Sequence, residues 1–123
     1  MSRGQYPSTR MRRNRMKAFS RRLVAETRLD TADLVWPLFV VEGNNITQPV
    51  DAMPGVSRYS IDRLLDQAAT AVRLTIPAIA VFPSIDPALK DYKGSLACDG
   101  DNLVCRAVRA VKAAHPDLGI VCD

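Results

Sequence analysis

The sequence predicts an α/β fold, because short apolar runs alternate with helical patterns along the chain. The apolar runs at residues 34–41, 79–82 and 118–123 have the length of buried strands. Such alternation is typical of a parallel sheet built from βα units. A parallel sheet is buried on both faces, so three strands and two helices predict only part of a domain. Because a closed (β/α)8 barrel takes about 250 residues, we expect an N-terminal arm and the first βα units of an incomplete (β/α)8 TIM barrel.

Charge divides the chain into a basic and a mildly acidic part. Residues 1–28 hold nine basic residues and one acid, a net charge of +8, whereas the remainder holds 8 basic and 12 acidic residues, a net charge of −4. The predicted organisation is therefore a basic N-terminal arm with a short helix at 1–28, and three strands with two helices at 29–123. No apolar run approaches the roughly 20 residues that span a bilayer, so no membrane partner is expected.

Composition and cysteine spacing favour a cytoplasmic protein. Hydrophobic residues make up 47% of the chain and charged residues 24%, which is ordinary for a globular protein. Cys98, Cys105 and Cys122 have the spacing of neither a zinc site nor a disulfide framework, so reduced thiols are expected. The N-terminus lacks the apolar core of a secretory signal, although its arginine-rich, acid-poor composition leaves a transit peptide open.

The arm is predicted to be extended up to residue 13 and then helical. Residues 1–13 contain glycine, proline and arginine without apolar periodicity, and should order only on a partner. Asn14 is the expected N-cap of a helix that runs to about Thr27, with Met16, Phe19 and Leu23 near helical spacing. A turn at 29–33 then leads to the first strand.

Proline and glycine residues shape the first strand and the segment after it. Pro37 cannot donate a hydrogen bond to a neighbouring strand, so regular pairing is expected to start near Leu38. Turn residues at 42–45 end the strand. Residues 46–58, with two prolines and the Pro54-Gly55 dipeptide, are an excursion that can contain a hairpin.

Two amphipathic helices alternate with the later strands. Ser60 is the expected cap of the first, which ends at Ile76, and its apolar stripe comprises Ile61, Leu64, Leu65, Ala68, Val72 and Ile76. Asp101 is the expected cap of the second, which ends at His115, and its stripe comprises Leu103, Val104, Ala107, Val108, Val111 and Ala114. Residues 85–100 form a long polar loop, a type that is often a functional lid.

The candidate site residues follow the predicted strands. In parallel α/β proteins the reactive groups gather at the carboxyl ends of the strands, which here carry Glu42, Ser84 and Asp123. A carboxylate there can act as a general base or hold a cationic group. For Glu42 and Ser84 the interpretation as ordinary loop residues is favoured. For Asp123, which directly follows the apolar residues 120–122, the functional interpretation is favoured.

Other reactive residues are weaker candidates. His115 lies at a helix C-terminus, and Cys122 should point away from the side of Asp123, so packing is the favoured role for Cys122. No Gly-rich phosphate loop and no metal-ligand set is recognisable. None of the lysines is placed at a strand end for Schiff-base chemistry; they are Lys17, Lys90, Lys93 and Lys112.

The basic arm has two competing interpretations. Clustered arginines can bind nucleic-acid phosphates. The only aromatic residues of the arm are Tyr6 and Phe19, and Phe19 belongs to the apolar stripe, so no stacking platform is present. Contact with an acidic neighbouring subunit is therefore favoured over nucleic-acid binding.

Several segments resemble those of the porphobilinogen synthase family, also called δ-aminolevulinic acid dehydratase, and they occur in the same order along the chain. The most specific is the run Pro37-Leu-Phe-Val40 followed by Met53-Pro-Gly-Val56. The resemblance extends from about Arg10 to the end of the chain and comprises residues 10–15, 19–24, 33–43, 53–61, 79–83, 102–109 and 119–123.

The resemblance implies a (β/α)8 barrel with an N-terminal arm, assembled into a homo-octamer through the arm. It implies the condensation of two 5-aminolevulinate molecules to porphobilinogen, with loss of two waters, in haem biosynthesis. Two Schiff-base lysines of the family lie in later strands, without counterparts here. Zinc or magnesium is expected, with ligands beyond this chain. Asp123 is the one residue that matches an active-site position, near the substrate that closes the ring.

Two alternatives to this enzyme remain. One is an interaction or nucleic-acid-binding fragment that uses the arm without catalysis. The other is a different barrel lyase or aldolase. The continuing reading frame would separate them, because a Cys- or Asp-rich loop ending in His-Gly, followed by two strand-end lysines, is expected for the family.

Overall fold

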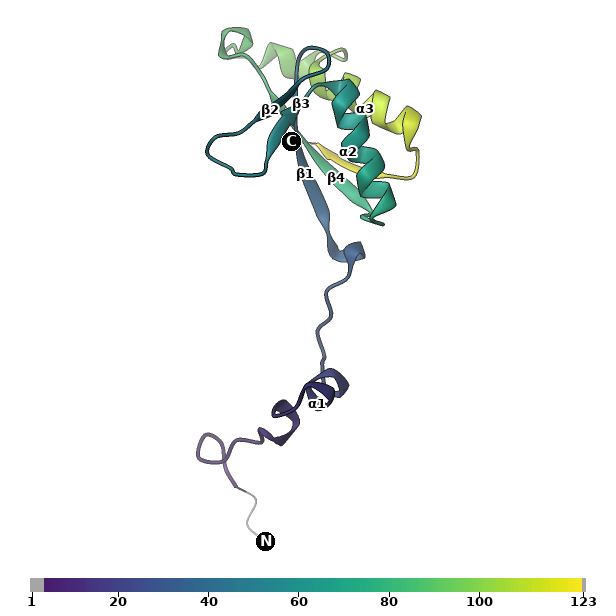
Figure 1. The fold of residues 1–123 in the computed structure, drawn as a ribbon. Helices are drawn as coiled ribbons and strands as arrows, with labels where there is room; N and C mark the ends of the chain where they lie inside the picture. The colour runs from purple at the N-terminus through teal and green to yellow at the C-terminus, as the bar shows by residue number, and fades with distance from the viewer. Residues whose placement is uncertain (1–3, 123) are drawn as a thin grey trace.

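The computed structural model describes residues 4–122, which form an extended arm and a five-stranded sheet unit (Figure 1). The strands are β1 (Val35–Val41), β2 (Thr47–Pro49), β3 (Ser57–Tyr59), β4 (Ala78–Ser84) and β5 (Gly119–Cys122). Their order in the sheet is β2-β3-β1-β4-β5. The parallel pairs are β3–β1, β1–β4 and β4–β5, while β2 is antiparallel to β3. The predicted α/β fold is therefore confirmed.

The three expected strands are β1, β4 and β5, and the excursion at 46–58 adds two more. It forms the antiparallel pair of β2 and β3, so the hairpin considered for this segment is present. The sequence pattern did not indicate that β3 would also pair with β1, at Phe39 and Val40. Strands of three residues are too short to show a period of two.

The prediction that Pro37 delays pairing until Leu38 is wrong. β1 pairs with β4 over its whole length, from Val35 beside Ala78 to Val41 beside Ser84. On its other side, β1 meets β3 only at 39 and 40. Among residues 4–122, no strand pairs with that side at the level of Pro37, so the missing N–H of proline costs no hydrogen bond there.

Two helices cover one face of the sheet. The helices α2 (Ile61–Arg73) and α3 (Leu103–Ala114) lie side by side on that face (Figure 1). They bury alternate residues of the strands, since side chains of a strand point to opposite faces. The resulting core comprises Leu38, Val40, Ile79 and Val81 from the strands, and Leu64, Ala68, Ala71, Leu103, Ala107 and Val111 from the helices. Their burial supplies the main stabilisation of the unit.

The opposite face of the sheet is apolar but only partly covered in residues 4–122. Phe39 and Phe82 are half-buried neighbours on adjacent strands, with ring centroids 5.8 Å apart. Val35 and Val121 are each 53% exposed. An apolar face of this kind normally packs against further structure.

The arm contains less helix than its periodicity predicts. A 3-10 turn, η1 (Arg13–Arg15), precedes the six-residue helix α1 (Ala18–Leu23), which begins after Lys17 rather than at Asn14 and ends before Thr27. The side chains of Phe19 and Leu23 remain 64% and 80% exposed. Without burial of an apolar face, propensity alone supports only a marginal helix, which explains the shorter length.

The helix caps predicted for α2 and α3 act differently from expectation. Asn102, not Asp101, is the N-cap of α3, and its Oδ1 accepts the N–H of Cys105 at 2.9 Å. Ser60 does occupy the N-cap position of α2, but its hydroxyl makes no cap hydrogen bond.

Among residues 4–122, no helix has the length and apolarity that a bilayer crossing requires.

Candidate functional site at the carboxyl ends of the strands

The carboxyl ends of β1 and β4 open into a cavity of about 500 Å³. This volume lies in the range of small-molecule sites. The walls are the two strand ends, the polar loop that follows β4, and the first turn of α3. Glu42 and Ser84, two of the three sequence-predicted site residues, both line this cavity. Asp123, the third, lies outside the described residues.

Glu42 is engaged in an ion pair. Its carboxylate accepts a hydrogen bond from the guanidinium of Arg106 on α3. The Nε of Arg106 also donates to the carbonyl of Asp101 at 2.9 Å. Because both side chains of the pair are substantially exposed, solvent screens it and it contributes little stability. Its main effect is to fix the Glu42 carboxylate against α3, which supports the favoured structural interpretation of Glu42.

Ser84 ends β4 directly beside Val41 of β1. Within residues 4–122 no side chain forms a hydrogen bond with its hydroxyl. A serine nucleophile needs an adjacent base. The described residues therefore provide no activated nucleophile at this position.

A polar network that the sequence did not predict holds the loop after β1. The N–H of Asn45 donates to both carboxylate oxygens of Asp62, at 3.1 and 3.0 Å. The fully buried hydroxyl of Ser60 accepts the N–H of Ile46 at 2.8 Å and donates to Asp62 at 2.6 Å. These bonds, chiefly that of Ser60, hold the pKa of Asp62 below its ordinary value. The start of α2 thus positions the loop that begins with Glu42.

The polar loop over the cavity has its own internal structure. It contains two 3-10 turns, η3 (Pro87–Leu89) and η4 (Ser95–Cys98). Asp86 accepts the N–H of Ala88, and Asp91 accepts the N–H of Ser95, each at 2.9 Å. The hydrogen bonds from Ser95 hold the pKa of Asp91 below its ordinary value. Asp86 and Asp91 thus have a structural role in forming the turns of the loop. A lid function for the loop stays a prediction.

Two further candidates lie away from the cavity. His115 follows the C-terminal end of α3, whereas the N-terminal end of that helix lines the cavity. Cys122 is exposed on β5, so the expectation that it packs is not met, because no element of residues 4–122 lies beyond that strand. Partial burial, with a smaller effect of Cys105, raises the pKa of the Cys122 thiol, which disfavours the nucleophilic thiolate.

Lys17 lies in the arm and Lys112 on α3, whereas Lys90 and Lys93 lie in the polar loop after β4; within residues 4–122 no lysine lines the cavity. Lys112 of α3 instead donates to the carbonyls of Pro116 and Leu118, at 3.0 and 2.7 Å, and closes the turn before β5. Residues 4–122 also contain no group of three or more His, Cys, Asp or Glu side chains that could hold a metal ion.

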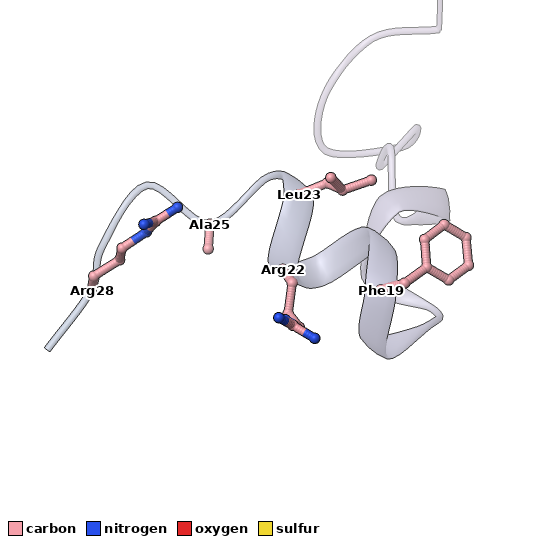
Figure 2. A pocket seen from close by; sticks show the side chains of 5 residues that line it. All are labelled: Phe19, Arg22, Leu23, Ala25 and Arg28. Atoms are coloured by element: carbon pink, nitrogen blue, oxygen red, sulfur yellow. The ribbon is translucent and has the colours of Figure 1, made fainter.

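A second cavity lies on the arm, far from the strand ends. It has a volume of about 570 Å³ and is lined by Phe19, Arg22, Leu23, Ala25 and Arg28. Figure 2 shows that these side chains come only from α1 and the segment after it. The lining of this cavity contains apolar and cationic side chains and no carboxylate. That composition fits a contact surface better than a catalytic site.

The geometry defines the class of protein. A parallel sheet whose strand ends open into a small-molecule cavity is the arrangement of α/β enzymes and ligand-binding proteins. Comparison with known proteins narrows this class, since the family model "Delta-aminolevulinic acid dehydratase" matches residues 8–123. The chain belongs to the δ-aminolevulinic acid dehydratase family.

Individual relatives agree with this assignment. Delta-aminolevulinic acid dehydratase of Bradyrhizobium diazoefficiens is 51% identical over 93% of this chain and 32% of its own length. The Halalkalibacterium halodurans enzyme of the same name is 42% identical over 93% of this chain and 34% of its own length. The crystal structure of delta-aminolevulinic acid dehydratase (porphobilinogen synthase) from Toxoplasma gondii, in complex with its reaction product porphobilinogen, superposes with a TM-score of 0.88 at 36% identity, covering 94% of this chain and 32% of that one. The chain thus spans about a third of the length of these relatives.

Proposed function

We propose that this chain is the N-terminal part of a porphobilinogen synthase, a hydro-lyase that joins two 5-aminolevulinate molecules into porphobilinogen in haem biosynthesis. The observation that carries the proposal is the match to the product-bound T. gondii enzyme, at a TM-score of 0.88 over 94% of this chain. The balanced reaction consumes two substrate molecules and releases one pyrrole and two waters.

The proposed architecture is an incomplete TIM barrel. In it, residues 1–28 form the arm, and residues 29–123 supply the first three barrel strands, β1, β4 and β5, with α2 and α3 outside them. The partly exposed face that carries Phe39 and Phe82 supports this proposal, because in a closed barrel it would face the packed interior.

Asp123 is the proposed catalytic residue. Its support is its place in the sequence, immediately after β5, since strand ends carry the chemistry of barrels. We propose that it holds the substrate amine and moves protons during ring closure. The complete enzyme is proposed to use zinc or magnesium, as its family is metal-dependent. Because residues 4–122 contain no ligand set, no step is assigned to the metal.

The proposed reaction is tested in the protein that the complete reading frame encodes. Incubated with 5-aminolevulinate and assayed for pyrrole by colour development, it should accumulate porphobilinogen with two substrate molecules consumed for each product. Consumption without pyrrole would favour another barrel lyase or aldolase. No reaction with either zinc or magnesium added would contradict the proposal.

The proposed assembly is a cytoplasmic homo-octamer held by the arm, without a nucleic-acid or membrane partner. The arm offers exposed apolar side chains, Phe19 and Leu23, next to Arg22 and Arg28. Such a surface gains stability when it is buried on another subunit.

Deletion of residues 1–13 from the complete protein should shift its assembly from octamers to smaller species, measured by sedimentation velocity. The physical reason is the loss of arm contacts and of four arginines, Arg3, Arg10, Arg12 and Arg13, that can meet acidic neighbours. A variant with these four arginines replaced by lysine is the charge-matched control and should keep most of the octamer. Unchanged assembly with lost RNA binding would favour the nucleic-acid alternative.

A further inference from the structure

The arm and the turn that follows it, together residues 4–33, are connected to the rest of the structure mainly through the chain itself. One side-chain hydrogen bond connects the two parts within residues 4–122: the hydroxyls of Thr31 and Thr75 lie 2.9 Å apart, although 44 positions separate them in the sequence. Figure 1 shows the arm extending away from the sheet at the amino end of β1. The contact between Thr31 and Thr75 lies close to the point where the chain passes from the arm into β1.

On the arm side, Thr31 is held by a rigid turn. It begins η2 (Thr31–Asp33), whose cap Asp30 accepts the N–H of Ala32 at 3.0 Å. In return, Asp33 accepts the N–H of Asp30 at 2.8 Å. This reciprocal pair of hydrogen bonds fixes the turn. The hydroxyl of Thr31 is therefore presented from a defined backbone.

On the sheet side, Thr75 adopts a conformation that a β-branched residue rarely takes. It follows α2 with φ +58°, in the left-handed region. The N–H of Thr75 donates to the carbonyl of Val72, and that of Ile76 to the carbonyl of Ala71, each at 3.0 Å. Helix ends of this kind usually have glycine at such a position. Threonine is strained in this conformation, but unlike glycine it has a hydroxyl that can form a hydrogen bond.

Each hydroxyl of the pair also lies near a second acceptor. The hydroxyl of Thr75 is 2.7 Å from the carbonyl of Leu74, and that of Thr31 is 3.5 Å from Oδ1 of Asp30. Either threonine can therefore be the donor in the contact. Leu34, Leu74 and Ile76, close to the pair in the sequence, line a small apolar groove of about 230 Å³. Leu34 and Leu74 are 41% and 46% exposed, so solvent reaches the side chains around the contact.

We propose that Thr31 and Thr75 form a latch that fixes the direction in which the arm leaves the sheet. The strained threonine at the end of α2 provides one hydroxyl, and the capped turn provides the other. The latch keeps residues 30–34 in place at the amino end of β1. This inference concerns the conformation of the arm and does not depend on the proposed reaction.

The test is hydrogen–deuterium exchange, measured by mass spectrometry on the complete protein. The reporters are peptides with the amides of Asp33 and Leu34, which donate within the turn at 3.1 Å. Thr31→Val and Thr75→Gly each remove one hydroxyl and should speed exchange roughly 2- to 10-fold, the range expected for a single hydrogen bond. Thr31→Ser and Thr75→Ser keep the hydroxyl, so the amides of the turn should exchange about as slowly as in the wild-type protein.

Two controls separate the latch from general destabilisation. Thr27→Val, an arm substitution away from the contact, should leave exchange of the turn unchanged, and peptides of α2 should keep their protection in Thr31→Val. The double variant Thr31→Val, Thr75→Gly should exchange no faster than either single variant, because both remove the same interaction. Additive effects, or unchanged exchange of the turn in Thr31→Val, would overturn the proposal.

Discussion

The 123-residue chain, expressed alone and supplied with 5-aminolevulinate, is expected to form no detectable porphobilinogen. The family resemblance implies two Schiff-base lysines, and the described residues place none at the carboxyl end of a strand. Lys112 instead closes the turn before β5 through hydrogen bonds to two carbonyls. When catalytic groups act as a unit, removal of one or several of them abolishes most of the rate enhancement, so the turnover rate should fall by many orders of magnitude.

The measurement is a colorimetric pyrrole assay with the complete protein as the positive control. Because the isolated chain leaves Val35, Val121 and the edge of β5 exposed, aggregation is a second route to inactivity. Circular dichroism and sedimentation of the same sample distinguish the two. A soluble, cooperatively melting chain without turnover would assign the inactivity to the missing groups, whereas turnover near that of the complete protein would contradict the fragment interpretation.

Residues with a strong local signal were predicted well. The apolar runs of β1, β4 and β5 and most of the stripes of α2 and α3 follow from periodicity, and each stripe contributes buried residues such as Leu64 and Val111. Val72 and Ala114 belong to the predicted stripes but are exposed, whereas Ala71, outside the predicted stripe, is buried. The apolar pattern is the strongest guide to these elements because burial of apolar side chains supplies most of the stabilisation. It also predicted that Glu42 and Ser84 would meet at one edge of the sheet.

Features that depend on contacts distant in the sequence were not predicted. Ser60 looks like a simple helix cap, but its hydroxyl bonds to Ile46, 14 residues earlier. Asp101 and Asn102 are equally good caps by residue type, and only the backbone around them selects Asn102. Thr75 carries no local signal for a left-handed conformation, since threonine disfavours it. In each case tertiary geometry overrides the local preference.

In the complete protein, Asp123→Asn is expected to lower turnover by about 10²-fold or more, the scale of general acid–base catalysis. The substitution preserves the shape of the side chain and removes its charge. In the proposed role, the carboxylate balances the charge of the substrate amine and exchanges a proton with it. The asparagine can neither accept a proton nor balance that charge.

A matched control is Asp117→Asn, the same chemical change at an exposed position in the turn before β5, which should leave turnover within about twofold of wild type, as expected for an exposed surface substitution. Melting temperature and oligomer size should stay near those of wild type in both variants. Glu42→Gln weakens the pair with Arg106 and should affect turnover much less than Asp123→Asn, because its carboxylate is already held by the guanidinium. If Asp123→Asn retained full activity, or lost it only through unfolding, Asp123 would be a structural residue and the chemistry would rest on groups beyond this chain.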